Sequence, residues 1–162
     1  MPQEIRAGIG FDIHRLVRGR RLVLGGVEVP AESGLLGHSD GDALLHAVTD
    51  ALLGAIGAGD IGELFPDTAP ENKDRDSSDF VREAARRARA AGFRVQNLDA
   101  TVILESPRLS AHKGAIRARL AELCECDPSR VNVKAKTGEG LDAVGRGEAL
   151  AARAVVLLAR EG

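Results

Sequence analysis

The sequence contains no Trp and no Tyr, and only four of its residues are Phe. Proteins that bind single-stranded nucleic acid use aromatic side chains as platforms for stacked bases, and this chain has too few to build one. It also lacks a basic excess, because 22 Lys and Arg stand against 24 Asp and Glu, giving a net charge of −2. Since nucleic-acid-binding surfaces are usually basic, we expect no nucleic-acid partner.

Cysteine and long apolar runs are also scarce. The two cysteines, Cys124 and Cys126, are too close in sequence to reach disulfide geometry easily, and a single C-x-C pair lacks the second ligand pair of a structural zinc site. We interpret them as free thiols in a reducing compartment. The longest apolar stretches are too short to span a bilayer, and no basic segment followed by an apolar one opens the chain. We therefore expect a cytoplasmic protein with no membrane partner.

The composition is that of one globular domain. The chain has 162 residues, of which 44% are hydrophobic and 28% are charged. That length and balance allow a buried core and leave little room for a second domain. No internal repeat or low-complexity tract divides the sequence. We expect a single domain over residues 1–162.

Alternating apolar and polar residues predict several strands. They are expected at Ile5–Phe11, Arg21–Leu24, Val27–Val29, Leu98–Glu105 and Val131–Lys136. The Gly25–Gly26 pair between the second and third of these is typical of a hairpin turn. Helical patterns lie between the strands, at Asp42–Ile56, Ser78–Ala91 and Ser110–Cys124.

The last segment, Glu148–Arg160, is ambiguous from its residues alone. Its Ala, Leu and Arg content favours a helix, whereas the A-V-V-L-L run at 154–158 suits a buried strand. Three loops rich in Gly, Pro, Asp and Thr are expected at Ala31–Gly41, Ala58–Asp76 and Thr137–Gly147. Together the elements predict an α/β fold in two layers, with one mixed sheet backed by helices.

Two residues with metal-binding side chains stand at the end of the first predicted strand. Asp12 and His14 are two positions apart, so on an extended chain both point to the same face. A D-x-H pair alone is a weak signal, because such residues are often ordinary surface groups. The nearby Gly8 and Gly10 do not make a dinucleotide site, since no third glycine opens a helix after them.

The helix at Asp42–Ile56 carries a polar stripe on an otherwise apolar surface. The stripe consists of Asp42, His46, Thr49 and Asp50, which share one face of the helix. Polar groups on a buried helix must be hydrogen-bonded to one another or bound to a ligand. An internal hydrogen-bond network and a metal site are both compatible with this pattern.

Taken together, Asp12, His14 and His46 offer one oxygen and two nitrogen ligands. This set suits a divalent ion such as Zn²⁺ and leaves the fourth tetrahedral position open, as in catalytic zinc sites. Either Asp42 or Asp50 is placed to orient the imidazole of His46 from outside the ligand shell.

Two further segments have residues suited to phosphate. In G-H-S-D-G-D at 37–42, the N–H groups at the helix start and His38 suit an anion, although capping of the helix by Ser39 or Asp40 explains the same spacing. In A-K-T-G-E at 135–139, Lys, Thr and Glu suit a phosphate and a second metal ion, although such a sequence is also a common turn.

The order of these motifs resembles that of the 2-C-methyl-D-erythritol 2,4-cyclodiphosphate synthase family. The resemblance runs from about Arg6 to Leu158. It rests on G-I-G-F-D-I-H at 8–14, L-L-G-H-S-D-G-D-A-L-L-H-A-V-T-D-A-L-L-G-A at 35–55, G-D-I-G-E-L-F-P-D-T at 59–68, V-N-V-K-A-K-T-G-E at 131–139 and G-R-G-E at 145–148. The pairing of D-x-H with H-S-D-G-D-x-x-x-H is highly specific.

The resemblance implies a lyase of the non-mevalonate isoprenoid pathway. Its substrate is the nucleotide-linked 4-diphosphocytidyl-2-C-methyl-D-erythritol 2-phosphate, which is cyclised with release of CMP. Members of the family are homotrimers that assemble around their sheets, with active sites between subunits, and their last segment is a strand. The resemblance places Zn²⁺ on Asp12, His14 and His46, and Mg²⁺ or Mn²⁺ on Glu139 together with the substrate phosphates.

Individual roles follow from the same resemblance. His38 and Thr137 match the catalytic pair that stabilises the transition state, and Arg146 matches a basic residue facing the central cavity of the trimer. Residues 104–110, 135 and 136 match the cytidine pocket, mostly contributed by a neighbouring subunit. The full set matched to substrate contacts is Asp12, His14, His38, Ser39, Asp60, Gly62, Phe65, Pro66, Asp67, Thr68, Arg108, Ala135, Lys136, Thr137, Glu139 and Arg146.

The sequence departs from the family pattern at a few of these places. It has A-K-T-G-E where the family often has A-T-T-T-E, Arg108 where Lys is usual, and Ala143 in place of an aromatic residue beside the central cavity. Two other interpretations are open on the same residues. One is a zinc-dependent phosphohydrolase that activates water, and the other is a non-enzymatic trimeric metal-binding module.

Overall fold

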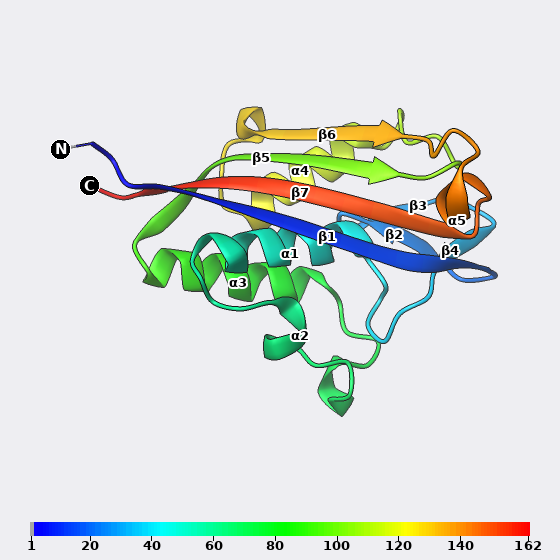
Figure 1. The fold of residues 1–162 in the computed structure, drawn as a ribbon, viewed down its shortest axis with the longest axis horizontal. Coiled ribbons are helices and arrows are strands. Elements are labelled where there is room, and N and C mark those ends of the chain that lie inside the picture. The colour runs from blue at the N-terminus through cyan, green and yellow to red at the C-terminus, as the bar shows by residue number, and fades with distance from the viewer. Residues whose placement is uncertain (1) are drawn as a thin grey trace.

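The computed structural model describes residues 2–162, which form a five-stranded mixed sheet with helices packed against it (Figure 1). The sheet order is β4-β1-β7-β5-β6, and β2 and β3 form a separate hairpin. The strands are β1 (Ile5–Arg18), β2 (Leu22–Leu24), β3 (Val27–Val29), β4 (Ser33–Leu35), β5 (Phe93–Ile103), β6 (Val131–Lys136) and β7 (Ala149–Arg160). The mixed α/β fold predicted from the sequence is confirmed.

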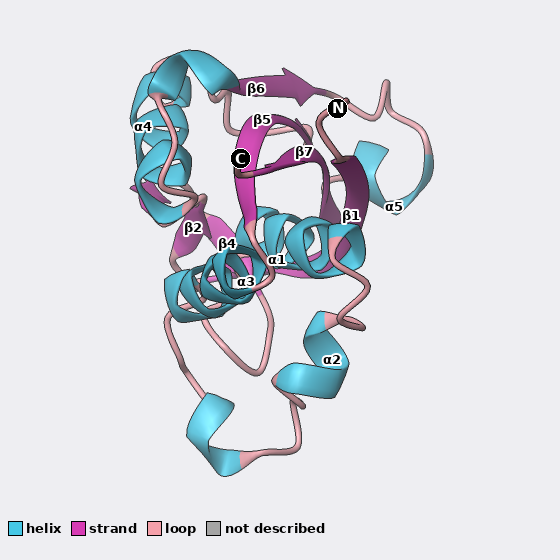
Figure 2. Ribbon diagram, turned by 90° about the vertical axis from the view of Figure 1, so that its left-hand side faces the viewer, coloured by secondary structure: helices cyan, strands magenta, loops and turns pink. Residues whose placement is uncertain are grey.

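The helices connect and cover these strands. They are α1 (Ala43–Ala55), α2 (Ile61–Leu64), α3 (Ser78–Ala90), α4 (Lys113–Leu123) and α5 (Asp142–Gly145), with single 3₁₀ turns at Pro70–Asn72 and Pro128–Arg130. Figure 2 shows α1 and α3 side by side along the sheet, with α4 beside β6. Within residues 2–162, no helix has the length and apolarity needed to cross a membrane.

The two long strands β1 and β7 form the centre of the sheet. They pair antiparallel from Ile5–Ala159 to Arg15–Ala149, and β5 pairs antiparallel with the other edge of β7 and parallel with β6. The ambiguous last segment is thus a strand, as the resemblance implied. Its residues Leu150, Ala152, Ala154, Val156 and Leu158 are buried, and this tertiary packing outweighs the helix propensity of its Ala and Leu residues.

Helix α1 packs closely on β1 because of two glycines. A Cβ atom at Gly8 would overlap the carbonyl oxygen of Ala51, and one at Gly10 would overlap that of Ala47. The even-numbered residues of β1 therefore face α1, and the odd-numbered ones face away from it. Asp12 and His14 share the helix side of the sheet, which confirms that an i, i+2 pair points to one face.

The opposite face of β1 is apolar and exposed. Ile9 is 72% exposed, and Phe11 and Ile13 are each about half exposed, with Val155 of β7 exposed beside them. We call these four residues the outer apolar face. Helices α1 and α3 lie on the other side of the sheet, and the short α5 packs on Ala149 and Ala151 at one end of this side.

Several predicted boundaries are wrong. β1 runs past Phe11 to Arg18, because β7 and β4 both pair with its second half. β4 lies in the predicted loop Ala31–Gly41, and the short helices α2 and α5 lie in the other two predicted loops. β5 begins at Phe93 rather than Leu98, because a bulge between Val95 and Asn97 breaks the alternation. α4 begins at Lys113 rather than Ser110.

Candidate functional site

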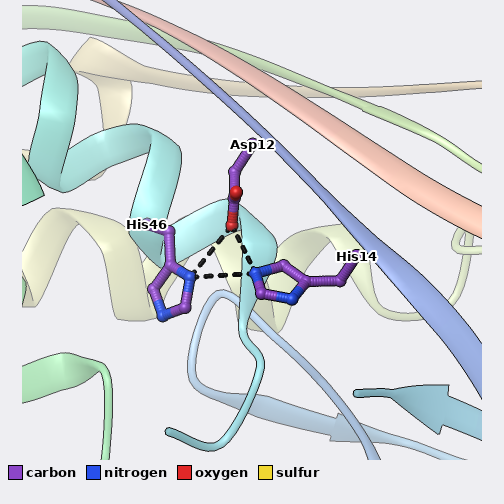
Figure 3. A group of neighbouring side chains, drawn as sticks. All are labelled: Asp12, His14 and His46. Carbon is purple, nitrogen blue, oxygen red and sulfur yellow. Dashed lines mark hydrogen bonds and ion pairs between the residues drawn. The ribbon is translucent and has the colours of Figure 1, made fainter. Parts of the chain in front are cut away.

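The three predicted metal ligands lie together between β1 and α1 (Figure 3). Asp12 Oδ2 is 2.7 Å from His14 Nε2 and 2.9 Å from His46 Nδ1, and the two ring nitrogens are 3.3 Å apart. All three ligand atoms lie within 4.8 Å of one another. One strand supplies Asp12 and His14, and the helix packed on it supplies His46.

Hydrogen bonds on the far side of each ring determine which nitrogens carry protons. The Nδ1–H of His14 donates to the carbonyl oxygen of Leu36 at 2.7 Å, so its Nε2 presents a lone pair to the centre. His46 Nε2 lies 2.8 Å from the hydroxyl of Ser77 and 3.1 Å from that of Ser39. The Ser77 hydroxyl donates its proton to Asp40, so it accepts from His46 Nε2–H.

With both neutral rings fixed in this way, two imidazole lone pairs and a carboxylate oxygen converge. Three acceptors at such distances repel one another unless a cation lies among them. The hydrogen bond to Asp12 raises the pKa of His14, against the lowering effect of burial. Burial alone would raise the pKa of Asp12, but hydrogen bonds from His14 and His46 outweigh it and lower that pKa. The donor set fits a divalent metal ion.

The prediction that Asp42 or Asp50 orients His46 is wrong. Asp50 accepts the backbone N–H of Ile61 at 2.8 Å, and Asp42 is the N-cap of α1, accepting from Leu45 N–H at 3.0 Å. Capping by Ser39 or Asp40 is therefore also wrong. Asp42 lies two positions after Asp40, directly before the helix, where its carboxylate reaches the third residue of the first turn.

The Asp42 carboxylate also holds the β2–β3 hairpin. It accepts the N–H groups of Gly25 and Gly26 at 3.0 and 2.8 Å, and the residue is fully buried. Burial raises its pKa to about 6, against the lowering effect of the three N–H donors. One side chain thus joins the start of α1 to the hairpin turn.

Replacing Asp42 by alanine is expected to lower the free energy of unfolding by about 3 kcal/mol or more, because three N–H groups lose their acceptor. Urea unfolding monitored by circular dichroism would measure it. Asp50→Ala is the control: it removes a half-buried carboxylate that accepts one N–H, so we expect a loss of about 1 kcal/mol. Equal losses in the two variants would contradict this role for Asp42.

A cavity of about 420 Å³ opens beside the triad. Its wall includes the predicted residues His38, Ser39, Gly62, Phe65, Pro66 and Asp67. On the aromatic side of the wall, Phe65 and Phe80 have ring centroids 4.5 Å apart and the guanidinium of Arg75 lies over both rings, so the three side chains stabilise one another. The space is large enough for a polar ligand that reaches the metal ligands.

Hydrogen bonds support this wall, and two further predicted residues, Asp60 and Thr68, lie beside it. His38 donates its Nε2–H to the carbonyl oxygen of Ala69 at 3.1 Å, which ties the two loops of the cavity together. Asp60 caps α2 by accepting the Glu63 N–H at 2.9 Å, and Thr68 is an exposed neighbour of Asp67.

The remaining predicted residues form a separate group at the carboxyl ends of β5 and β6. The backbone N–H of Leu104 donates to the Lys136 carbonyl oxygen at 2.9 Å, and that of Gly138 donates to the Glu105 carboxylate. This group holds Arg108, Ala135, Lys136, Thr137 and Glu139, and none of them lines the triad cavity within residues 2–162. Arg146 is exposed and pairs with Glu148 at 3.0 Å. One copy of the chain thus keeps the two predicted halves of the site apart.

Sequence reasoning missed several residues that line the cavity or support its walls, among them Phe80 and Asn72 in the lining. Ser77 contacts His46, Phe80 packs 6.0 Å from its ring, and buried Asn72 donates to the Pro66 carbonyl oxygen at 2.9 Å. Arg20 donates to the carbonyl oxygens of Gly37 and Ser39 and so holds the loop before α1. None of these residues belongs to a local motif, so only the tertiary fold reveals them.

A helix-backed mixed sheet that brings a carboxylate and two imidazoles together at a cavity defines an α/β protein with a candidate catalytic metal site. The comparison with known families is more specific. The chain belongs to the YgbB family, whose model matches residues 5–159.

Known relatives agree over nearly the whole chain. The sequence is 57% identical over 160 residues to the 2-C-methyl-D-erythritol 2,4-cyclodiphosphate synthase of Cupriavidus necator, covering 99% of this chain and 95% of that one. The fold matches the bifunctional IspDF from Campylobacter jejuni with a TM-score of 0.94 and 42% identity, over 99% of this chain and 43% of that longer one.

A solved 2C-methyl-D-erythritol-2,4-cyclodiphosphate synthase in its CDP-bound form gives a TM-score of 0.88 and 45% identity, over 94% of this chain and 99% of that one. Together with the family match, these similarities confirm the enzyme class and the cyclising step of the non-mevalonate pathway that the sequence predicted.

Proposed function

We propose that the chain converts 4-diphosphocytidyl-2-C-methyl-D-erythritol 2-phosphate into 2-C-methyl-D-erythritol 2,4-cyclodiphosphate and CMP. An oxygen of the 2-phosphate forms a bond to the β-phosphorus, and the bond from that phosphorus to the oxygen of the CMP phosphate breaks. The observation that carries the proposal is the convergence of Asp12, His14 and His46 at a cavity walled by the predicted substrate residues. The CDP-bound relative supports a nucleotide-linked substrate.

The proposed metal at the triad is Zn²⁺, with another divalent ion able to use the same ligands. Two imidazole nitrogens and one carboxylate oxygen match the ligand preference of zinc and leave one position open. When bound there, the ion supplies positive charge that polarises a phosphate oxygen. We place Mg²⁺ or Mn²⁺ at Glu139, where it neutralises the substrate phosphates.

The residues of the chain serve mainly to position the phosphates and neutralise their charge. The attacking phosphate is already ionised at neutral pH, so the reaction needs no strong general base. His38 and Thr137 are assigned to stabilise the reacting phosphate as its charge shifts, and Ser39 to hold a phosphate oxygen. Holding both phosphates in one cavity removes much of the entropic barrier, by up to about 7–11 kcal/mol in favourable cases.

Substrate contacts divide between the two groups described above. We assign the methylerythritol to the cavity loop, namely to Asp60, Gly62, Phe65, Pro66, Asp67 and Thr68. We assign the cytidine to Arg108, Ala135 and Lys136, with Thr137 and Glu139 reaching the phosphates. Arg146 belongs to the surface that faces the other copies. This division requires a neighbouring copy of the chain, because the second group does not line the first cavity.

We therefore place the protein in a homotrimer that packs sheet against sheet. The outer apolar face supports this assignment, because monomeric proteins rarely expose several large apolar side chains together. Closed symmetric assembly would cover that face and bring the Glu139 group of one copy to the triad of the next.

The pairing of β1 with β7 joins the two ends of the chain in one sheet, which supports one domain over residues 1–162. We also propose that the protein is cytoplasmic.

Light scattering should give a mass near three times the 17.0 kDa of one chain. Ile9→Asp is expected to yield a folded monomer with little cyclising activity. Ile9 is 72% exposed in one copy, so a single chain tolerates a charge there, whereas packing of this face against other copies does not. Ala118→Asp, on the exposed side of α4, is the control and should stay trimeric. A wild-type monomer with full activity would contradict the assembly.

Phosphorus NMR of the wild-type reaction tests the function itself. The proposal requires CMP and a cyclic diphosphate as the two products. A linear methylerythritol phosphate would show instead that water attacks the diphosphate, as in a zinc phosphohydrolase. No conversion by a zinc-loaded, trimeric preparation would favour a metal-binding module without activity.

A further inference from the structure

Ser77 is a fully buried polar residue directly behind the metal triad. It is 0% exposed and lies just before α3, on the opposite side of His46 from Asp12. Its hydroxyl is 2.8 Å from His46 Nε2, while Asp12 Oδ2 is 2.9 Å from His46 Nδ1. The imidazole is therefore held at both of its nitrogens, one facing the metal position and one facing Ser77.

Asp40 continues this chain of contacts. Its carboxylate accepts the Ser77 hydroxyl through Oδ1 and the Ser77 backbone N–H through Oδ2 at 3.0 Å. It also accepts the N–H of Asp42 at 3.0 Å, and its own N–H donates to the Arg75 carbonyl oxygen at 3.1 Å. Asp40 is thus fixed to the segments before α1 and α3, so the Ser77 hydroxyl has one available orientation.

The directions of these hydrogen bonds follow from the groups involved. A carboxylate only accepts, so the single hydroxyl proton of Ser77 goes to Asp40. The lone pairs of Ser77 then face His46, which must donate from Nε2–H. A metal-ligating histidine whose other nitrogen donates to a fixed acceptor has its tautomer and ring orientation set before the metal binds.

We propose that Ser77 and Asp40 are positioning residues for the metal ligand His46. Asp40 orients the Ser77 hydroxyl, and Ser77 holds the His46 ring with its Nδ1 directed at the metal position. This inference rests on the triad being the metal site of the proposed function. It also gives a role to Asp40, for which the sequence spacing indicated only an alternative helix cap.

The same arrangement affects Ser39. Its hydroxyl is 3.1 Å from His46 Nε2 and 3.4 Å from the Ser77 hydroxyl, so Ser39 is the next acceptor available to the ring. While Ser77 takes the His46 proton, the hydroxyl proton of Ser39 is free to donate to a substrate phosphate. Without Ser77, the ring turns toward Ser39, and the metal ligand and the phosphate contact are both disturbed.

Zinc affinity measured by competition with a chromophoric chelator tests the proposal. Ser77→Ala is expected to bind Zn²⁺ about 10- to 100-fold more weakly than the wild type, as is usual when the partner of a metal-bound histidine is lost. Ser77→Thr keeps a hydroxyl at the same position and should recover most of the affinity. Ser78→Ala is the matched control, because Ser78 is equally buried but contacts Arg119 rather than His46.

Cobalt substitution adds a readout that a purely structural change would not move. The visible spectrum of Co²⁺ reports ligand geometry, so Ser77→Ala should change its band positions while Ser78→Ala leaves them unchanged. The melting temperature of the metal-free variants shows whether each one folds. If Ser77→Ala does not fold, Asp40→Asn takes its place and is expected to weaken zinc binding in the same direction.

The outcomes separate the two proposals. If the wild type and His46→Ala bind zinc equally weakly, the triad is not the metal site and the proposed function fails. If the wild type binds zinc tightly and His46→Ala does not, the metal site stands. Wild-type affinity and cobalt spectrum in folded Ser77→Ala, or in Asp40→Asn where that variant replaces it, would then overturn the positioning role alone.

Discussion

His46→Ala is expected to abolish tight zinc binding while the protein remains folded. The substitution removes one of three ligands. Loss of a hydrogen-bond partner of a metal-bound histidine lowers metal affinity by up to about 100-fold, so loss of the histidine itself should lower the zinc affinity by more than that. The fold should survive, because alanine favours helix and the imidazole faces the cavity rather than the core. Metal analysis after dialysis against a weak chelator gives the zinc content, and circular dichroism confirms the fold.

His38→Ala is the matched control for this experiment. His38 lines the same cavity but donates to the Ala69 carbonyl oxygen, and it is not among the three converging ligands. We expect this variant to keep its zinc and to lose activity, since His38 is assigned to the reacting phosphate. Full zinc retention in His46→Ala, or equal zinc loss in both variants, would contradict the ligand assignment.

The strand half of the metal triad was predictable because short-range geometry decides it. Two residues at i, i+2 on a strand face the same side whatever the strand pairs with, and Gly8 and Gly10 in the same strand allow a helix to approach that side. His46 is a polar residue on a helix whose other faces are almost entirely buried. The sequence therefore indicated the two elements that carry the ligands, and the fold brings His46 to them from 32 residues after His14 and 34 after Asp12.

The surroundings of the triad were not predictable, because distant segments supply them. Ser77 lies 31 residues after His46, and a serine before a helix is ordinary capping chemistry from sequence alone. For Asp42, the sequence pattern suggested a contact that the fold does not make. Its place in the polar stripe suggested a partner for His46, but the N-cap position turns its side chain to the hairpin at Gly25 and Gly26.

The predicted end of β1 was wrong for a similar reason, because distant segments determine where the strand ends. The D-I-H-R-L-V-R segment after Phe11 alternates less clearly, and it is strand because β7 and β4 pair with it. Pairing across the sheet is a tertiary effect that local propensity does not encode. The consequence is functional, since Asp12 and His14 lie within a paired strand and not at a loose strand end.

Glu139→Gln is expected to retain zinc yet lose most of the cyclising activity. Two anionic phosphates must approach each other in a partly desolvated cavity, where their repulsion is large. A carboxylate at 139 is the proposed holder of the second cation, and removing a comparable electrostatic stabiliser costs about 10²- to 10³-fold in kcat. Water activation at the triad alone would not need this residue.

Glu125→Gln is the matched control, because Glu125 is also a glutamate with positive φ, 53° against 54° for Glu139, but it pairs with Arg89 away from the triad. Phosphorus NMR would follow cyclic diphosphate and CMP in both variants at equal zinc content. The proposed role requires a large loss in Glu139→Gln, partial recovery at high Mg²⁺, and a near-normal rate in Glu125→Gln. A near-normal rate in Glu139→Gln would remove the second-cation assignment, because the phosphates would then be neutralised without this carboxylate.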